Sequence, residues 1–537
     1  MRVTEKLLLG IACSALCLTM AGCSDDNDHP SNITKEYKLG TVAVGDQGIL
    51  LVSNGQGDKG SDEITITSSA LPGQATTETQ NDTETENEAP NEDGEAKLDS
   101  QGSADPHGLT HKLIEQSREL LKAKATQTKV LAKESFTPNT RYTTLAKGGD
   151  IEMNVDFDFN GKTKKATFRK VLDSNETKSV LVFAEVDPET DDACIDETKA
   201  LEIDKMFGEA NPYDDEDKAI GDRVRNIFGE EWRENGGRDG EKKVIIMVCK
   251  NMKEGLFGYF DPKDAFSKED SKYSNEGEIL YLNGTISDFE LYSTIAHEFQ
   301  HMCDFNQKTC LDGEFSGEYE ETSINEGKST LAEDLCGFKM IAEGENAETK
   351  EDEETKEHPS NGFLVNVVSN YLANPQSVSL VGFSNDPREY GQAYLLMRYI
   401  TDRCGVDKLN GIATSPYVGF DNIGEITSIP FDTLYYDFGI TNLLSNRDNA
   451  LKDYSYKSID LSKNYLNGKG EAVSLGWATP TPITQKSKNY DIYSRSNNYY
   501  SITYPSLEKD VVIGLSAPLT SESGLPFFKD GLFDKIY

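Results

Sequence analysis

Two of the six histidines of this chain lie four positions apart, in the stretch TIAHEFQHMCDF at residues 294–305. On a helix, His297 and His301 would lie on one face about one turn apart, so both imidazoles can reach the same metal ion. Glu298 would lie at the flank of that ion, where a carboxylate can accept a proton from an attacking water. The alternative is a packed helix with two satisfied core histidines. The H-E-x-x-H spacing favours the metal site, because it rarely arises by chance.

A catalytic zinc ion needs a third protein ligand and keeps its fourth position for water. The extended H-E-x-x-H-x-x-G-x-x-H pattern fails here, because Asp304 and Gln307 occupy the positions that require Gly and His. The segment SINEGKSTLAEDL supplies a carboxylate instead. Glu326 follows His301 after 24 intervening residues, enough for the first helix to end near Gly313 and for the chain to return. We therefore expect Zn²⁺ bound by the two histidines and this glutamate.

A second glutamate on the same segment is a candidate supporting residue. Glu333 lies two helical turns beyond Glu326 and on the same face. It could accept the imidazole N–H that faces away from the zinc, a contact that fixes the tautomer of the ring. An ordinary solvated charge on the helix is the alternative, and the spacing does not decide between the two.

The developing negative charge on a scissile carbonyl oxygen calls for a further hydrogen-bond donor. Tyr390 and Tyr394, in EYGQAYLLMRY, are better placed by chain order than His358, which lies in an acidic stretch. We assign the role to Tyr390. Core tyrosines on an amphipathic helix are the alternative for both residues.

The elements around the motif are the ones that such a site requires, a strand followed by a capped helix. EGEILYLN at residues 276–283 predicts a strand that could hold an extended substrate by β-addition. Ser287 and Glu290 then form a capping box in front of the apolar run that contains the histidines. KKVIIMVCK predicts a buried strand, and the segments after the motif have helical spacing. The fold class that follows is α+β.

Changes in composition divide the 537 residues into several parts. These parts are a lipoprotein signal peptide at 1–22, a tether with a short β segment at 23–70, a disordered acidic linker at 71–107, a helix with a β-rich domain at 108–190, a catalytic subdomain at 191–335, a helical subdomain at 336–450 and a small β-containing appendage at 451–537.

The N-terminal run ends in Met20-Ala21-Gly22-Cys23, which is typical of a bacterial lipobox. There the signal peptide is cut before the cysteine and the thiol receives a diacylglycerol. An ordinary cleaved signal with an incidental cysteine is the alternative. Ser24 beside Cys23 favours the outer membrane. We therefore expect an outer-membrane lipoprotein of the bacterial cell envelope, exposed at the surface or in the periplasm and attached to the membrane by its lipid alone.

The formal net charge of −39 argues against a nucleic-acid partner. Binding to phosphates needs clustered Lys and Arg side chains, and acidic residues dominate this chain. A protein or peptide substrate is compatible with that charge.

The pair of motifs HEFQH and NEGKSTLAED resembles the gluzincins, the metalloprotease clan of thermolysin and the one-zinc aminopeptidases. The order of GLFGYFDPKDAF, SNEGEILYLN, AHEFQHMCDFN, SINEGKSTLAEDL and YGQAYLLMRYI, over about residues 180–445, is similar to the hyicolysin family of secreted bacterial metallopeptidases. The resemblance implies a zincin-type, thermolysin-like catalytic domain, with a mixed sheet, an active-site helix and a mainly helical C-terminal subdomain. It also implies the roles of the site residues: ligands His297, His301 and Glu326, and base Glu298.

Two residues depart from the family pattern close to the third ligand. Ser323 stands where relatives often have Trp, and Lys328 stands where an apolar or small residue is usual.

On these grounds we expect a zinc-dependent endopeptidase that hydrolyses peptide bonds of extracellular or periplasmic proteins. A zinc aminopeptidase is one alternative, although Asn275-Glu276 is a poor copy of the G-x-M-E-N motif with which that clan reads a free amine. The other alternative is a surface-exposed binding or adhesin lipoprotein with an inactive or structural zinc site. The intact base and three ligands argue against this last alternative, and the large segments outside the resemblance argue for it.

Overall fold

The structure, a computed structural model, describes residues 32–38, 47–54, 61–69, 108–125, 139–156, 163–231, 237–311, 314–315, 318–345, 360–376, 378–447, 452–503, 512–518 and 528–534. The chain forms two compact units, one of residues 1–80 and 479–537 and one of residues 81–478. The predicted signal peptide, Cys23, the predicted linker and His358 lie outside the described residues.

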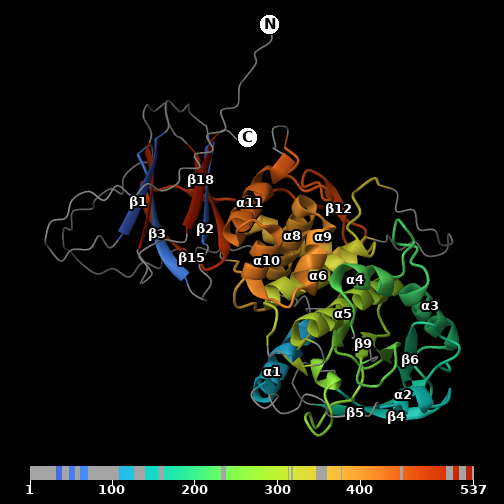
Figure 1. Ribbon diagram of the computed structural model, residues 1–537. Coiled ribbons are helices and arrows are strands. Elements are labelled where there is room, and N and C mark those ends of the chain that lie inside the picture. Colours follow the sequence, from blue (N-terminus) through green and yellow to red (C-terminus); the bar gives the residue numbers. More distant parts are fainter. Residues whose placement is uncertain are drawn as a thin grey trace, which may run out of the picture. The chain divides into compact units, whose positions relative to one another are not determined.

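The smaller unit contains two four-stranded sheets, with strand orders β1-β17-β3-β15 and β14-β16-β2-β18 (Figure 1). The strands are β1 (Asn32–Lys38), β2 (Gln47–Asn54), β3 (Ser61–Ser68), β14 (Thr481–Ile483), β15 (Ser487–Tyr493), β16 (Ser496–Thr503), β17 (Val512–Pro518) and β18 (Phe528–Asp534). Neighbouring strands are antiparallel except for the parallel pair β14–β16.

This unit corrects the predicted division of the two ends of the chain. Segments 23–70 and 451–537 were expected to be separate, but β2 pairs with β16 and β18, and β3 pairs with β15 and β17. Residues 451–478 belong instead to the larger unit. Alternation of apolar and polar residues predicts a strand, but it carries no information about a partner at the other end of the chain.

The larger unit is built on a six-stranded sheet of order β4-β5-β6-β7-β9-β8. Its strands are β4 (Asp150–Val155), β5 (Lys164–Lys170), β6 (Val180–Glu185), β7 (Val244–Cys249), β8 (Gly258–Phe260) and β9 (Ile279–Asn283). The pairs β6–β7 and β7–β9 are parallel, and the other pairs are antiparallel.

Two expectations about this region were wrong. A domain boundary at residue 190 would cut the sheet between β6 and β7, which pair along their length. The EGEILYLN strand, β9, was expected to hold a substrate by β-addition, which needs a sheet edge, but it lies between β7 and β8, and β8 is the edge among the described strands. Both errors arise because strand order depends on long-range pairing and not on local pattern.

Helices cover both faces of this sheet. Alternate side chains of the strands, such as Leu181, Ile245 and Tyr281, form one apolar core with α1 (Gly108–Ala125) and α2 (Arg141–Thr144). On the opposite face, α3 (Glu197–Gly208) packs against β6 and α5 (Asp288–Thr309) packs against β9 and β8, while α4 (Ile220–Phe228) packs against both of these helices (Figure 1). Short elements nearby are η1 (Pro262–Ala265), β10 (Cys310–Leu311) and β11 (Glu314–Phe315).

The second half of the larger unit is mainly helical. Its elements are α6 (Thr322–Leu335), α7 (Gly362–Ala373), α8 (Pro387–Cys404), α9 (Val406–Thr414), α10 (Gly419–Thr427), α11 (Phe431–Leu444), η2 (Lys452–Tyr454), β12 (Asn464–Leu466) and β13 (Ala472–Ser474). Helix α8 packs against α6, α7, α9 and α11, and its residues 390–402 are all buried. The mixture of helices and sheets is compatible with the predicted α+β class. None of the helices in the described part of the chain has the length and hydropathy that a membrane crossing requires.

The α7–α8 contact depends on a glycine. A Cβ atom added to Gly391 would lie 2.1 Å from the carbonyl oxygen of Val367, so alanine there must push the two helices apart. We expect Gly391→Ala to lower the free energy of unfolding by about 1–3 kcal/mol, measured by urea denaturation. The control is Gly468→Ala, whose Cβ would lie 3.9 Å from the nearest atom, the Cα of Gly362. Equal losses in the two variants would contradict the packing argument.

Candidate metal centre

Helix α5 carries the motif in the position that its capping residues set. The backbone N–H of Ser287 donates to Glu290 Oε2 (3.0 Å) and the N–H of Glu290 donates to Ser287 Oγ (3.3 Å), so the predicted capping box is confirmed. The apolar face of α5 packs inward, with the ring of Phe299 edge-on against that of Phe207 at 4.9 Å. The two histidines lie on another face, which meets α6.

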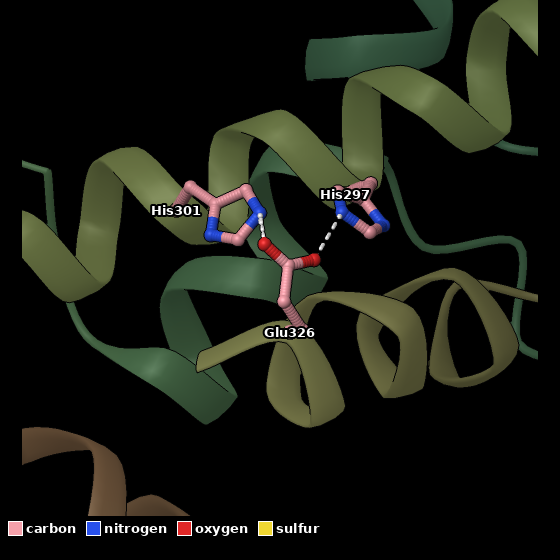
Figure 2. A group of neighbouring side chains, drawn as sticks. All are labelled: His297, His301 and Glu326. Atoms are coloured by element: carbon pink, nitrogen blue, oxygen red, sulfur yellow. Dashed lines mark ion pairs between the residues drawn. The ribbon is translucent and has the colours of Figure 1, made fainter. Parts of the chain in front are cut away.

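The structure brings together the three side chains that were predicted to bind zinc. His297 and His301 on α5 both point to Glu326 on α6, and all three are fully buried (Figure 2). The Nε2 atom of His297 lies 3.5 Å from Glu326 Oε2, and the Nε2 atom of His301 lies 3.6 Å from Glu326 Oε1. The three ligand atoms lie within 4.8 Å of one another, and no other group of three or more His, Cys, Asp or Glu in the described residues converges in this way.

The approach of α6 to α8 fixes the backbone next to the third ligand. Gly327 follows Glu326, and a Cβ atom at this position would lie 2.7 Å from the carbonyl oxygen of Ala393 on α8. A glycine therefore lets α6 sit closely between α5 and α8, with Glu326 directed toward the histidines.

Glu333 contacts the far side of the first histidine. Its Oε1 lies 2.8 Å from His297 Nδ1, while Oε2 accepts hydrogen bonds from Ser293 Oγ (2.6 Å) and Asn361 Nδ2 (2.8 Å). Glu333 is 1% exposed, so the alternative of a solvated charge is wrong. An ionised carboxylate only accepts, so an ionised Glu333 would hold the proton of the His297 ring on Nδ1 and leave Nε2 as a lone pair.

That tautomer decides what the centre can hold. With the proton on Nδ1, the Nε2 lone pair of His297 faces a carboxylate oxygen of Glu326. A lone pair and an anionic oxygen repel each other in a buried, low-dielectric site unless a cation lies between them. The arrangement is therefore made for a positive charge at its centre.

A metal ion fits this donor set. Two imidazole nitrogens and one carboxylate oxygen are ligands that Zn²⁺ takes at about 2.0–2.2 Å, and two such ligands at a tetrahedral angle lie roughly 3.3–3.5 Å apart. The spacings of 3.5 and 3.6 Å, which join the two histidines to different oxygens of Glu326, are close to that value. The three residues could hold one metal ion and leave a further coordination position for water.

A buried ion-pair cluster links α5 to α6 beyond the triad. Lys328 pairs with Asp304 on α5, and its Nζ also lies 3.1 Å from Glu320 Oε2. Burial alone would lower the pKa of Lys328, but attraction to the two carboxylates outweighs it and raises the pKa. The ion pairs of Lys328 explain the lysine at this position. The other unusual residue, Ser323, is also buried, and its Oγ donates to the carbonyl oxygen of Leu380 at 2.7 Å.

Glu298, the predicted base, is fully buried beside the triad and carries one unexpected contact. Its Oε2 accepts a hydrogen bond of 2.7 Å from Thr110 Oγ1 on α1. The same hydroxyl oxygen accepts the backbone N–H of Phe260 in β8 at 2.9 Å. A residue from outside the motif region thus contacts both the base and the edge strand.

The two tyrosines considered as donors are both buried. Tyr394 donates its hydroxyl to Asp334 Oδ2 at 2.9 Å. The ring of Tyr390 packs edge-on against Phe363 (5.7 Å) and Phe383 (4.9 Å). These contacts are those of core tyrosines, and the catalytic role of Tyr390 stays a prediction.

Three residues that contact the site were not identified from the sequence. Ser293 lies one turn before His297 on the same helix face, a spacing that could have identified it. Asn361 caps α7, where its Oδ1 accepts the N–H of Leu364 at 3.0 Å, and its place before an apolar run was a usable signal. Nothing in the local sequence around Thr110 points to Glu298.

A scan against models of known protein families finds no match. The chain is 33% identical over 105 residues to neutral metalloprotease ShpI of Staphylococcus hyicus, a match that covers 17% of this chain and 23% of that protein. The chain thus spans less than a quarter of the length of this relative.

The contact between Glu333 and His297 leads to a test of the metal centre. Glu333→Gln keeps the shape of the side chain but removes the negative charge that orients and polarises the ring. We expect it to weaken zinc binding about tenfold, measured by competition with a chelator. The control is Glu425→Gln on the exposed face of α10. Equal zinc affinity in the Glu333→Gln variant and the wild type would contradict the supporting role.

Proposed function

We propose that this protein is a zinc-dependent endopeptidase of the gluzincin type, with His297, His301 and Glu326 as zinc ligands and Glu298 as base. The observation that carries the proposal is the convergence of the two histidines and the glutamate around one point, at which all three side chains are fully buried. The similarity to a protein named as a neutral metalloprotease supports it. The combination of a mixed sheet, a motif helix and a helical second half is also compatible with a zincin-type catalytic domain.

The chemistry of hydrolysis would fall to the residues around the ion. A bound zinc ion supplies a Lewis acid that makes water more acidic and offsets negative charge on the scissile carbonyl oxygen. Glu298 takes a proton from the attacking water at a carboxylate oxygen and gives it to the nitrogen of the leaving amine, so protons balance over the reaction. Glu333 keeps the His297 ring in the tautomer and orientation that the ligand role requires. Tyr390 remains our candidate for an additional oxyanion donor.

Endopeptidase activity is favoured over aminopeptidase activity by the surroundings of Asn275 and Glu276. The amide of Asn275 is buried and donates to Tyr281 Oη and to the carbonyl oxygen of Asn154, both at 2.7 Å. Glu276 pairs with Arg238 and Lys268. Both side chains are committed to contacts within the fold, and neither is set to read the free amine of a substrate.

The proposed substrates are extracellular or periplasmic proteins. This part of the proposal follows from the lipobox at Cys23, which would tether the enzyme to the outer membrane of a bacterial cell envelope, either at the cell surface or facing the periplasm. An adhesin with a structural metal is the competing function.

The test of the proposal separates the base from the ligands. Glu298→Gln removes the proton acceptor and leaves the three ligand side chains in place. We expect it to retain one zinc per chain and to hydrolyse casein and a blocked peptide about 10²–10⁴-fold more slowly than the wild type, because general-base catalysis contributes a factor of that order. Zinc content is measured by mass spectrometry of the metal. If the wild type and the variant both bind one zinc per chain and hydrolyse the substrates at equal rates, Glu298 is not the base.

A further inference from the structure

The edge of β8 beside Glu298 is where an extended peptide could join the sheet. In the β8–β9 ladder the N–H of Asn283 donates to the carbonyl oxygen of Phe257. Hydrogen-bonded and non-hydrogen-bonded pairs alternate along an antiparallel ladder, so the N–H of Phe260 points away from β9. An extended substrate that adds to β8 would use this outward N–H.

Thr110 already occupies that position. Its hydroxyl oxygen accepts the N–H of Phe260 at 2.9 Å, and its proton goes to Glu298 at 2.7 Å. A hydroxyl has one proton to donate, and here the base receives it. One fully buried side chain thus engages both the backbone group that would hold a substrate and the carboxylate that would activate water.

Helix α1 also contacts residues on the opposite, helical side of the site. The ring of His111 packs edge-on against Phe383 at 5.8 Å, and Phe383 packs against Tyr390. Burial lowers the pKa of His111 to about 4, so this ring is neutral at neutral pH and packs as an aromatic side chain.

Further along α1, a second set of contacts reaches the segment that leads into α6. Ser117 Oγ lies 3.2 Å from Tyr319 Oη, and Arg118 Nη2 donates to the carbonyl oxygen of Glu320 at 3.3 Å. The helix therefore bridges the sheet half and the helical half of the unit.

We propose that α1 is an intramolecular inhibitor: its first turn takes the place of substrate between β8 and Glu298, and the chain in this arrangement is a latent peptidase. This inference rests on the proposed function. Activation then requires α1 to leave β8, which also withdraws Leu109 and Leu113 from the apolar core that they share with the sheet. Water and substrate gain access to Glu298 and to the N–H of Phe260 in the same step.

The test measures access to the site separately from turnover. Thr110→Val removes the hydroxyl and keeps the side-chain shape. The double variant Ser117→Ala/Arg118→Ala weakens the attachment of α1 through its contacts with Tyr319 and Glu320, without changing a residue that contacts Glu298. The matched control is Thr414→Val, which removes a hydroxyl that donates to the carbonyl oxygen of Asn410 in α9.

Each zinc-loaded full-length protein is titrated with a blocked peptide hydroxamate, and hydrogen exchange at the Phe260 amide is followed by mass spectrometry. We expect at least tenfold tighter hydroxamate binding in both α1 variants, with faster exchange at Phe260 and at least fivefold faster hydrolysis of a blocked peptide. The control and wild type should agree in all three measurements.

The remaining outcomes distinguish the two proposals. Unchanged hydroxamate binding in both α1 variants, with zinc present, would overturn the inhibitor role. So would a fall in the hydrolysis rate of Thr110→Val with zinc retained, since the hydroxyl would then be positioning the base. Tighter binding without hydrolysis in any of the proteins would uphold the block by α1 and contradict the proposed peptidase function.

Discussion

The crossing of α5 and α6 is the constraint on which the site depends, and a buried hydrogen bond and a buried ion pair hold it. At one end Glu333 contacts His297, and at the other Lys328 pairs with Asp304. Leaving one partner of the Lys328–Asp304 pair alone would cost about 3–5 kcal/mol. A shift of one helix along the other would break this pair and the contact of Glu333 with His297, so the three candidate ligands are held in register.

The same crossing connects the two halves of the larger unit. Helix α5 packs on the edge of the sheet, at β9 and β8, and α6 packs on α8 in the helical half. The close contact of Gly327 with α8 sets the position of α6, and the capping box sets where α5 begins. The candidate metal site thus lies where the sheet and the helices meet, and helix α1, from earlier in the chain, contacts both sides of that junction.

Short-range spacing predicted the centre of this site because its residues lie on two helices with strong signals. His297, His301 and Glu326 follow from a four-residue spacing and a returning segment, and the capping residues of α5 were readable as such. The pairing of Lys328 with Asp304 could not be predicted, because it depends on how α5 and α6 cross. In the sequence each residue is only a departure from a motif. Three features could not be predicted, because they involve partners far apart in sequence: the strand order, the pairing of the two chain ends in one β unit, and the contact of Thr110 with Glu298. Local periodicity does not identify such partners.

Locating the bound metal ion tests the proposed site most directly. Crystals of the zinc-loaded protein would be measured at the zinc absorption edge, and an anomalous difference map calculated. We expect one peak about 2.0–2.2 Å from the Nε2 atoms of His297 and His301 and from an oxygen of Glu326. An absent peak at the α5–α6 crossing, or a zinc ion bound by other residues, would contradict the proposed site.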